Sequence, residues 1–248
     1  DGMQAGSSLR LEPTKVEEIK GSQIGDEALL QAVRLCNQER RLLRDLSFSR
    51  ASSKAPIRSQ DFIELNHGSF LLDKSTMLEI LNQAKTELSA KSVSKGPRIL
   101  LTGSTLSLGD SKVQDLIEEA GGLVVFEEFA EGIKPYRDLV NEHGELMRNL
   151  AEFYFWNRIP PAWFRPDKER LEELVRLCRS FKVDGIVWYQ LMFRESYKTE
   201  SMYFPERIKH ETGIPVLILE SDYDSAEIGQ LRTRIETFIT TLRRSRND

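Results

Sequence analysis

The sequence predicts an α/β protein in which a helical region precedes a flavodoxin-like, doubly wound sheet of four parallel strands. Two observations support this fold class. From Pro97 onward, short apolar runs alternate with longer amphipathic stretches, which is the order of elements in βαβ folds. Before that point the apolar residues follow a helical period. We therefore expect a helical N-terminal region over residues 1–95 and a Rossmann-like or flavodoxin-like α/β domain over residues 96–248.

The helical region contains three expected helices. Asp26 can cap the first, whose apolar residues recur at helical spacing and whose arginines gather near its C-terminal end. A stretch rich in Ser, Ala, Lys and Pro interrupts the pattern after this helix, and such a composition is typical of loops. The helices are expected over residues 26–46, 61–70 and 73–88, with a loop over 47–58 and a linker over 89–96.

Four apolar runs in the second half predict strands: Arg98–Thr102, Gly122–Phe126, Gly185–Tyr189 and Pro215–Glu220. Helical patterns separate the strands and close the chain, over Lys112–Ala120, Tyr136–Ile159, Asp167–Phe181, Glu200–Thr212 and Ser225–Arg243. Gly121 and Gly213 precede strands at the places where helix C-caps are expected. Strands joined by helices cross over right-handedly, so we expect them to lie parallel in one sheet covered on both faces.

Composition narrows the function classes. The 248 residues include 35 Lys and Arg against 39 Asp and Glu, a formal net charge of −4. This balance argues against nucleic acid or an anionic membrane as a partner. No apolar run approaches the roughly 20 residues that span a bilayer. The two cysteines, Cys36 and Cys178, form no ligand pair, so we expect buried reduced thiols and a cytoplasmic location.

A ligand site is expected beyond the carboxyl ends of the strands, where open parallel sheets bind ligands. The loop after the first strand, Thr102–Asp110, is small and hydroxylated and leads into a helix, so its amides can cradle a phosphate or a carboxylate. It has neither the Walker A nor the GxGxxG pattern. The alternative is a tight turn with Asp110 or Ser111 as the helix cap. The candidate ligand-binding residues of this loop are Gly103, Ser104 and Thr105.

Acidic residues follow the other strands, at Glu127, Glu128, Glu220, Asp222 and Asp224. One hypothesis is that they converge as a Mg²⁺ site or a carboxylate acid–base pair, with Glu220 and Asp222 as candidate ligand-binding residues. The alternative is a set of solvated acids, with Asp224 or Ser225 capping the last helix. No set of metal ligands is assigned.

The histidines and the aromatic residues give less indication of a functional site than the strand-end loops do. His67, His143 and His210 lie away from the predicted strand ends, so we expect surface or helix-end histidines and no Ser–His–Asp or Cys–His arrangement. The run Phe153–Trp156, with Trp163 and Phe164, either belongs to the domain core or forms a face for a partner subunit or an acyl group.

Four segments share a pattern with one known family. The last strand and helix read IPVLILESDYD over Ile214–Asp224 and GQLRTRIE over Gly229–Glu236. RILLTGSTLSLGD over Arg98–Asp110, VDGIVWYQLMF over Val183–Phe193, and the helix Asp26–Leu46 occur before them in the family's order.

Through these segments the chain, over about residues 20–245, resembles the 2-hydroxyacyl-CoA dehydratase family, which includes the benzoyl-CoA reductase subunits. In that family a strand ending in Glu-Thr-Asp-Tyr leads into a Gly-Gln-x-x-Thr-Arg helix. The resemblance implies a lyase or acyl-CoA reductase of two subunits, each holding a [4Fe–4S] cluster on cysteine thiolates. An ATP-driven activator would supply an electron, and the substrate thioester would be reduced to a ketyl radical.

The sequence departs from the family at the cluster ligands. The cysteines that the family places after the second and third strands correspond to Ala130 and Arg194, and a family Pro-Cys corresponds to Pro160-Pro161. The family's N-terminal cluster-bearing domain is also expected to be absent. Alanine has no donor atom and arginine stays protonated, so we expect no cofactor within this chain. Arg194 is expected either to bind a phosphate or carboxylate or to pair with Glu127, Glu128 or Glu195.

Three functions follow from these expectations. The first is a cluster-free, 2-hydroxyacyl-CoA dehydratase-like subunit that acts as a structural or regulatory partner of a catalytic subunit. The second is an enzyme component whose active site a partner chain completes, with acyl-CoA contacts from the Gly103–Thr105 loop. The third is a module that binds coenzyme A or another anion without chemistry. The expected partner is a homologous subunit in a heterodimer, or a second copy in a homodimer.

Overall fold

A computed structural model of the chain describes residues 14–53, 55–88, 96–107, 109–129, 132–157 and 168–245. The chain forms two compact units. The larger unit comprises Gln38–Asp138 and Ile159–Asp248, and it contains the sheet. The described residues of the smaller unit are 14–37 and 139–157. No helix within the described ranges is long and apolar enough to cross a membrane.

The sheet has four parallel strands in the order β2-β1-β3-β4. The strands are β1 (Arg98–Gly103), β2 (Leu123–Glu128), β3 (Gly185–Leu191) and β4 (Val216–Ser221). This is the flavodoxin-like order, so the predicted fold class is confirmed. The register between β1 and β2 shifts at Ile99 and Leu100, where β2 carries an extra residue. β1 and β3 are neighbours from which the chain leaves in opposite directions, and this switch point is where such sheets bind ligands.

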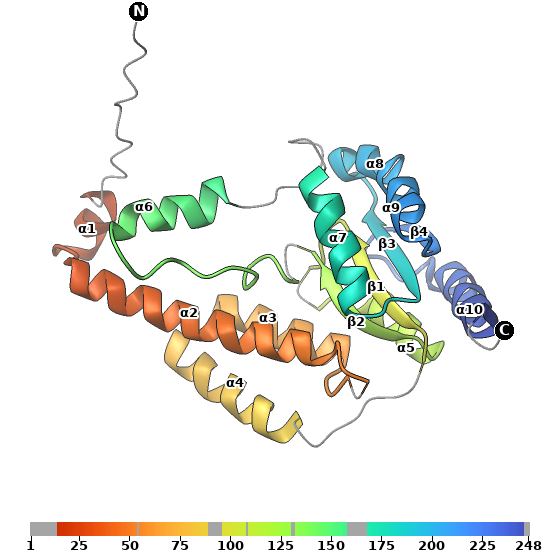
Figure 1. Cartoon of the computed structure of the whole chain (residues 1–248), viewed down its shortest axis with the longest axis horizontal. Coiled ribbons are helices and arrows are strands. Elements are labelled where there is room, and N and C mark those ends of the chain that lie inside the picture. Colours follow the sequence, from red (N-terminus) through yellow and green to blue (C-terminus); the bar gives the residue numbers. More distant parts are fainter. Residues whose placement is uncertain are drawn as a thin grey trace, which may run out of the picture. The chain divides into compact units, whose positions relative to one another are not determined.

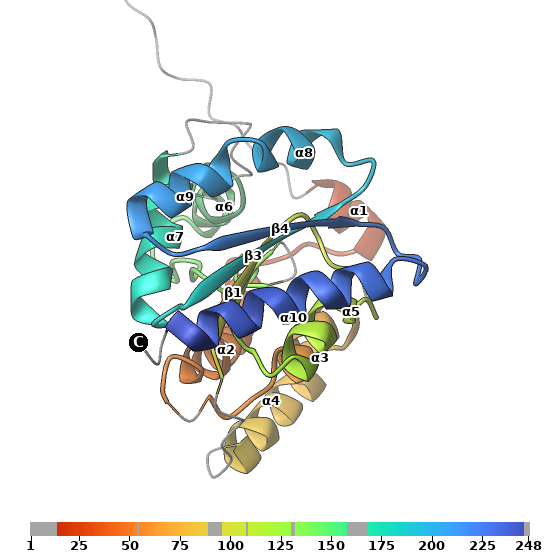
Figure 2. The ribbon, with the colours of Figure 1, turned by 90° about the vertical axis from the view of Figure 1, so that its right-hand side faces the viewer.

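Helices cover both faces of the sheet (Figure 2). On one face, α5 (Lys112–Glu119) and α10 (Ile228–Ser245) pack apolar side chains against alternate strand residues such as Leu101 and Val187. On the other face, α7 (Lys168–Ser180) and α9 (Phe204–Thr212) pack against Leu100 and Trp188. Successive strand residues point to opposite faces, so both faces of the strands are apolar.

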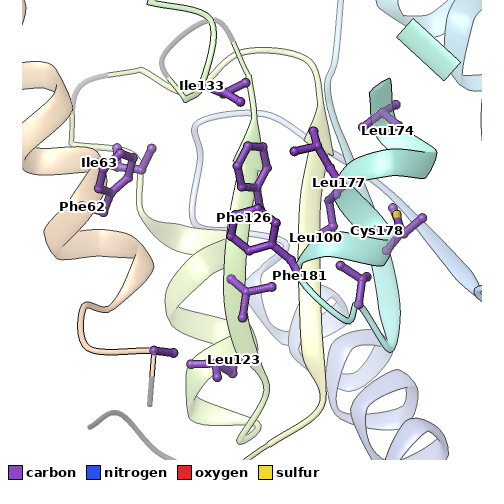
Figure 3. Close-up of a cluster of buried hydrophobic side chains, with 14 of the residues drawn as sticks. Phe62, Ile63, Leu100, Leu123, Phe126, Ile133, Leu174, Leu177, Cys178 and Phe181 are labelled. Carbon is purple, nitrogen blue, oxygen red and sulfur yellow. The ribbon is translucent and has the colours of Figure 1, made fainter. Parts of the chain in front are cut away.

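Most of the N-terminal helices, whose order along the chain can be followed in Figure 1, share the core of the sheet. The second half of α2 (Asp26–Ser49), α3 (Ser59–Leu71) and α4 (Lys74–Leu88) contribute buried apolar residues to the same cluster as β2 and α7. Figure 3 shows Phe126 of β2 among side chains of α3 and α7. These helices therefore pack with the sheet. The domain boundary between residues 95 and 96 stays a prediction.

Two predicted helices differ in the structure. The helix predicted over Glu200–Thr212 is α9, which begins only at Phe204 with Pro205 in its first turn, and a separate helix that was not predicted, α8 (Glu195–Ser201), precedes it. The long helix predicted over Tyr136–Ile159 is wrong for its first part. Among its described residues, up to Asn157, only α6 (Leu146–Ala151) and a π-helical turn, η1 (Glu152–Trp156), are helical.

The segment before α6 is held by side chains. The Asn37 amide donates to the Val140 carbonyl at 2.8 Å and accepts from the Val140 N–H at 3.0 Å. The Asn149 amide donates to the carbonyls of Asn141 and His143. Gly144 then turns the chain with a φ of +83°. These bonds satisfy backbone groups that a helix would otherwise pair, so this segment is stable without a helix. Both asparagines belong to the smaller unit, as does helix α1 (Thr14–Lys20).

The aromatic run at η1 is largely exposed. Tyr154, Phe155 and Trp156 are 51%, 68% and 54% exposed, so the core alternative is wrong for these residues. Trp163, Phe164 and Pro160-Pro161 lie outside the described residues, as do Ala130 and most of the expected linker over 89–96.

The backbone at the end of β1 requires glycine. Gly103 has a φ of +126°, and a Cβ built there would lie 2.1 Å from the Tyr189 carbonyl oxygen. We expect Gly103→Ala to lower the free energy of unfolding by at least about 2 kcal/mol, through backbone strain and separation of β1 from β3. Urea unfolding followed by circular dichroism measures the loss. Gly229→Ala, in a helix with open space around it, is the control and should be neutral or stabilising; an equal loss in both variants would contradict this account.

Candidate ligand site at the carboxyl end of the sheet

The switch point brings together four of the sequence-predicted site residues. Gly103 ends β1, and the Ser104 N–H donates to the Tyr189 carbonyl of β3 at 2.9 Å. Thr105 follows, and its hydroxyl oxygen accepts a hydrogen bond from Arg194 Nη2 at 3.2 Å. The loop after β1 and the residue preceding α8 are therefore in direct contact, and they place backbone amides, a hydroxyl and a guanidinium at one edge.

The alternative in which Arg194 pairs with Glu127 or Glu128 is wrong, because both carboxylates bind other arginines. Pairing with Glu195 stays a prediction. Its exposed side chain points to Thr105 instead. The preceding residue, Phe193, has a φ of +62° and is 87% exposed. A bulky residue with positive φ is uncommon and often marks a functional turn. The end of β3 thus presents a cation and an aromatic ring to solvent.

Glu220 and Asp222 lie at the end of β4 and do not join the Arg194 group. Glu220 Oε1 accepts from Lys198 Nζ of α8 at 3.3 Å. The Asp222 carboxylate accepts from the Asp224 N–H at 2.7 Å, which forms a local turn. Within the described part of the chain, no hydrogen bond connects either residue to Thr105 or Arg194. Asp224 accepts from the Ala226 N–H, which precedes α10, so this bond forms a local turn and does not cap the helix.

Lys112 is a site residue that the sequence did not single out. Its ammonium donates to the carbonyls of Asp222 at 2.5 Å and Asp224 at 3.0 Å, and to the Ser221 hydroxyl at 3.3 Å. These bonds tie the first residue of α5 to the end of β4. A hollow of about 670 Å³ lies beside them, lined in part by Ser107, Tyr223 and Arg232. The sequence shows Lys112 only as a lysine at the start of a helix, so its contact with the end of β4 could not be predicted.

Glu127 and Glu128 are neither solvated acids nor members of a common metal site. Glu127 is fully buried and accepts from both terminal nitrogens of Arg50, at 2.5 and 2.6 Å, and from the Ser59 hydroxyl at 2.6 Å. Arg50 is itself fully buried and lies 4.5 Å from the centre of the Phe62 ring. This pair connects the end of β2 to the end of α2 and the start of α3.

Glu128 forms a second buried network on the other side of β2. Its Oε2 accepts from Arg170 Nη2 at 2.8 Å and from the Thr102 hydroxyl at 2.7 Å, and Lys134 lies 3.7 Å from Oε1. Arg170 also donates to Glu200 and lies over the rings of Trp188 and Phe204. Burial alone would raise the pKa of Glu128, but the charges of Arg170 and Lys134 and these hydrogen bonds lower it to about 2.

The potential metal ligands are dispersed. The described residues contain no group of three or more His, Cys, Asp or Glu side chains that could hold a metal ion. Cys178 is buried in α7, as expected, whereas Cys36 is only partly buried. Burial raises the pKa of the Cys178 thiol to about 12. His143 and His210 are exposed, but the surface prediction is wrong for His67, which is buried in α3.

The Arg170 network generates a prediction. In Arg170→Met the carboxylates of Glu128 and Glu200 remain buried after losing their shared cation. We expect the free energy of unfolding to fall by roughly 3–5 kcal/mol, because a buried charge without its partner is strongly destabilising. Urea unfolding measures the change. Arg179→Met alters an exposed arginine of the same helix and should cost less than about 0.5 kcal/mol; similar losses in the two variants would refute a special role for the network.

Comparison with known proteins gives relatives along almost the whole chain. The chain is 31% identical over 240 residues to dehydratase subunit YjiM of Escherichia coli (strain K12), covering 94% of this chain and 62% of the relative. It is 28% identical to the (R)-phenyllactyl-CoA dehydratase beta subunit of Clostridium sporogenes, with coverages of 97% and 65%. Identity to a benzoyl-CoA reductase subunit of Thauera aromatica is 21%, with coverages of 92% and 60%.

The chain thus spans about three fifths to two thirds of the length of these curated relatives. Residues 12–242 match the family described as 2-hydroxyglutaryl-CoA dehydratase, D-component. The relatives are named as dehydratase or reductase subunits, in agreement with the resemblance seen in the sequence. The chain belongs to the 2-hydroxyglutaryl-CoA dehydratase D-component family.

Proposed function

We propose that this chain serves as a cluster-free subunit of a 2-hydroxyacyl-CoA dehydratase-type assembly, as the structural or regulatory partner of a catalytic subunit. The observation that carries the proposal is Arg194. At this position the family resemblance implies a cluster-ligating cysteine, and the chain has instead a guanidinium hydrogen-bonded to Thr105. A permanently protonated side chain offers iron no electron pair.

The remaining thiols do not fit a [4Fe–4S] cluster. Such clusters are commonly held by four cysteine thiolates, and the sequence has two cysteines. Cys178 packs in the core between α7 and the sheet, where its raised pKa keeps the thiol protonated at neutral pH. Cys36 belongs to the smaller unit. Neither thiol lies at the carboxyl end of a strand.

The exposed aromatic residues of η1 support the pairing part of the proposal. Three adjacent, largely exposed aromatic side chains form a surface of the kind enriched at subunit interfaces. The partner in this proposal is a homologous, cluster-bearing chain or a second copy of this chain, in the cytoplasm. No element of this proposal needs nucleic acid or a membrane.

A second candidate role has an observation in its favour. Arg194 lies next to the loop after β1, and Lys198 and Lys112 bind groups at the end of β4. Such an edge suits the phosphates of an acyl-CoA, in an active site that the partner chain completes. The two candidates differ in whether the substrate contacts this subunit.

Iron content tests the cluster-free proposal. We expect protein purified without oxygen to contain iron and acid-labile sulfide at background only, both before and after chemical reconstitution, because the chain lacks the thiolates that hold a cluster. A ferredoxin reconstituted in parallel is the positive control. Stoichiometric iron and sulfide with a thiolate-to-iron absorption band would overturn the proposal, and Cys36→Ser and Cys178→Ser would then identify the ligands.

A further inference from the structure

An apolar groove lies between α3 and α4, and α4 lies at the margin of the larger unit (Figure 1, Figure 2). The groove has a volume of about 420 Å³. Of the 15 residues of α4, only Met77 and Leu81 are buried. The helix therefore keeps most of its surface outside the core, and part of that surface forms one wall of the groove.

Both walls of the groove carry apolar side chains at helical spacing. On α4, Ile80, Ala84 and Leu88 are four residues apart, so they form one stripe along the helix. On the other wall, Leu65 of α3 and its C-cap residue Leu72 lie about two turns apart. Leu72 and Ile80 are 42% and 36% exposed. Apolar stripes of this kind, on two neighbouring helices, are the surface against which the apolar face of a further helix packs.

The border of the groove is acidic. The described residues that line it include three carboxylates, Asp61, Glu64 and Glu87, and no lysine or arginine. Arg58 balances Asp61 through two hydrogen bonds. Glu64 and Glu87 each accept from a neutral glutamine amide, and neither forms an ion pair with a described residue. One negative charge on each helix thus borders the apolar stripes without a neighbouring cation to balance it.

We infer that this groove docks an amphipathic helix of a protein partner, in which lysines or arginines flank the apolar stripe. The helices α3 and α4 have 13 and 15 residues and are about 20 Å long, so a partner helix of three to four turns matches them. Its apolar stripe packs between the two walls, and its cations meet Glu64 and Glu87. These carboxylates repel an acidic helix, which gives the groove its selectivity. The inference goes beyond the proposed function, because it adds a second docking surface to the aromatic one at η1.

A model peptide tests the inference. The probe is a fluorescein-labelled helical peptide of leucine and lysine, about 14 residues long, whose leucines form one stripe. The control peptide has the same composition in an order that forms no stripe. In fluorescence anisotropy titrations, we expect saturable binding of the striped peptide to the chain and at least about tenfold weaker binding of the control.

Variants of the groove locate the binding. Glu64→Lys with Glu87→Lys should weaken binding of the striped peptide by about tenfold or more, because attraction becomes repulsion. Ile80→Ser should weaken it at least about fivefold through the lost apolar contact. Glu79→Lys with Glu206→Lys makes the same change in net charge at exposed positions outside the groove, and it should change binding by less than about threefold. Circular dichroism checks that every variant keeps its helical content.

The contradicting results are distinct. Equal binding of the two peptides, or equal losses in the two charge-reversed double variants, would reduce the interaction to non-specific charge attraction and overturn the inference. An absence of saturable binding overturns it too. A dimer in analytical ultracentrifugation that Ile80→Ser dissociates would place a second copy of the chain in the groove instead. Iron content does not enter this test, so it can fail while the cluster-free proposal stands.

Discussion

The carboxyl end of β2 carries two adjacent carboxylates that point to opposite sides of the strand, and each is neutralised by a buried arginine. Glu127 binds Arg50, which connects β2 to the junction of α2 and α3. Glu128 binds Arg170, which connects β2 to α7 and, through Glu200, to α8. Neither charge tolerates burial alone, so each pair requires its helix to stay in place. The carboxyl edge of the sheet, where the candidate ligand site lies, therefore depends on these two pairs.

The same pairs explain why this edge divides into separate groups. Because Glu127 and Glu128 are committed to arginines, they cannot join Glu220 and Asp222 in a cation site, and Arg194 is left to contact Thr105. Lys112 holds the end of β4 through backbone carbonyls. The result is an edge that carries both cations, at Arg194 and Lys198, and exposed carboxylates, at Glu220 and Asp224.

The strands and most helices could be predicted because their signals are local. Apolar runs bounded by glycine predict strands, and the Asp73 side chain does accept from the Thr76 N–H at the start of α4. The first part of the predicted helix over Tyr136–Ile159 was wrong because Asn37, more than a hundred residues away, bonds Val140. Arg50 and Arg170 resemble surface charges in the sequence, since their partners lie 77 and 42 residues away. The sequence also did not predict that His67 and Gln114 are buried, because their burial follows from the packing of α3 beside α5.

Buried charge pairs connect the carboxyl edge of the sheet to its helices, and we propose that no metal contributes to its stability. The most direct test is the unfolding midpoint of protein purified without oxygen, measured with and without excess iron chelator. A metal bound only to the folded state would stabilise it by mass action, and its removal would lower the midpoint. The account predicts superimposable unfolding curves. A midpoint that falls by several degrees with chelator and recovers when iron and sulfide are restored would contradict it.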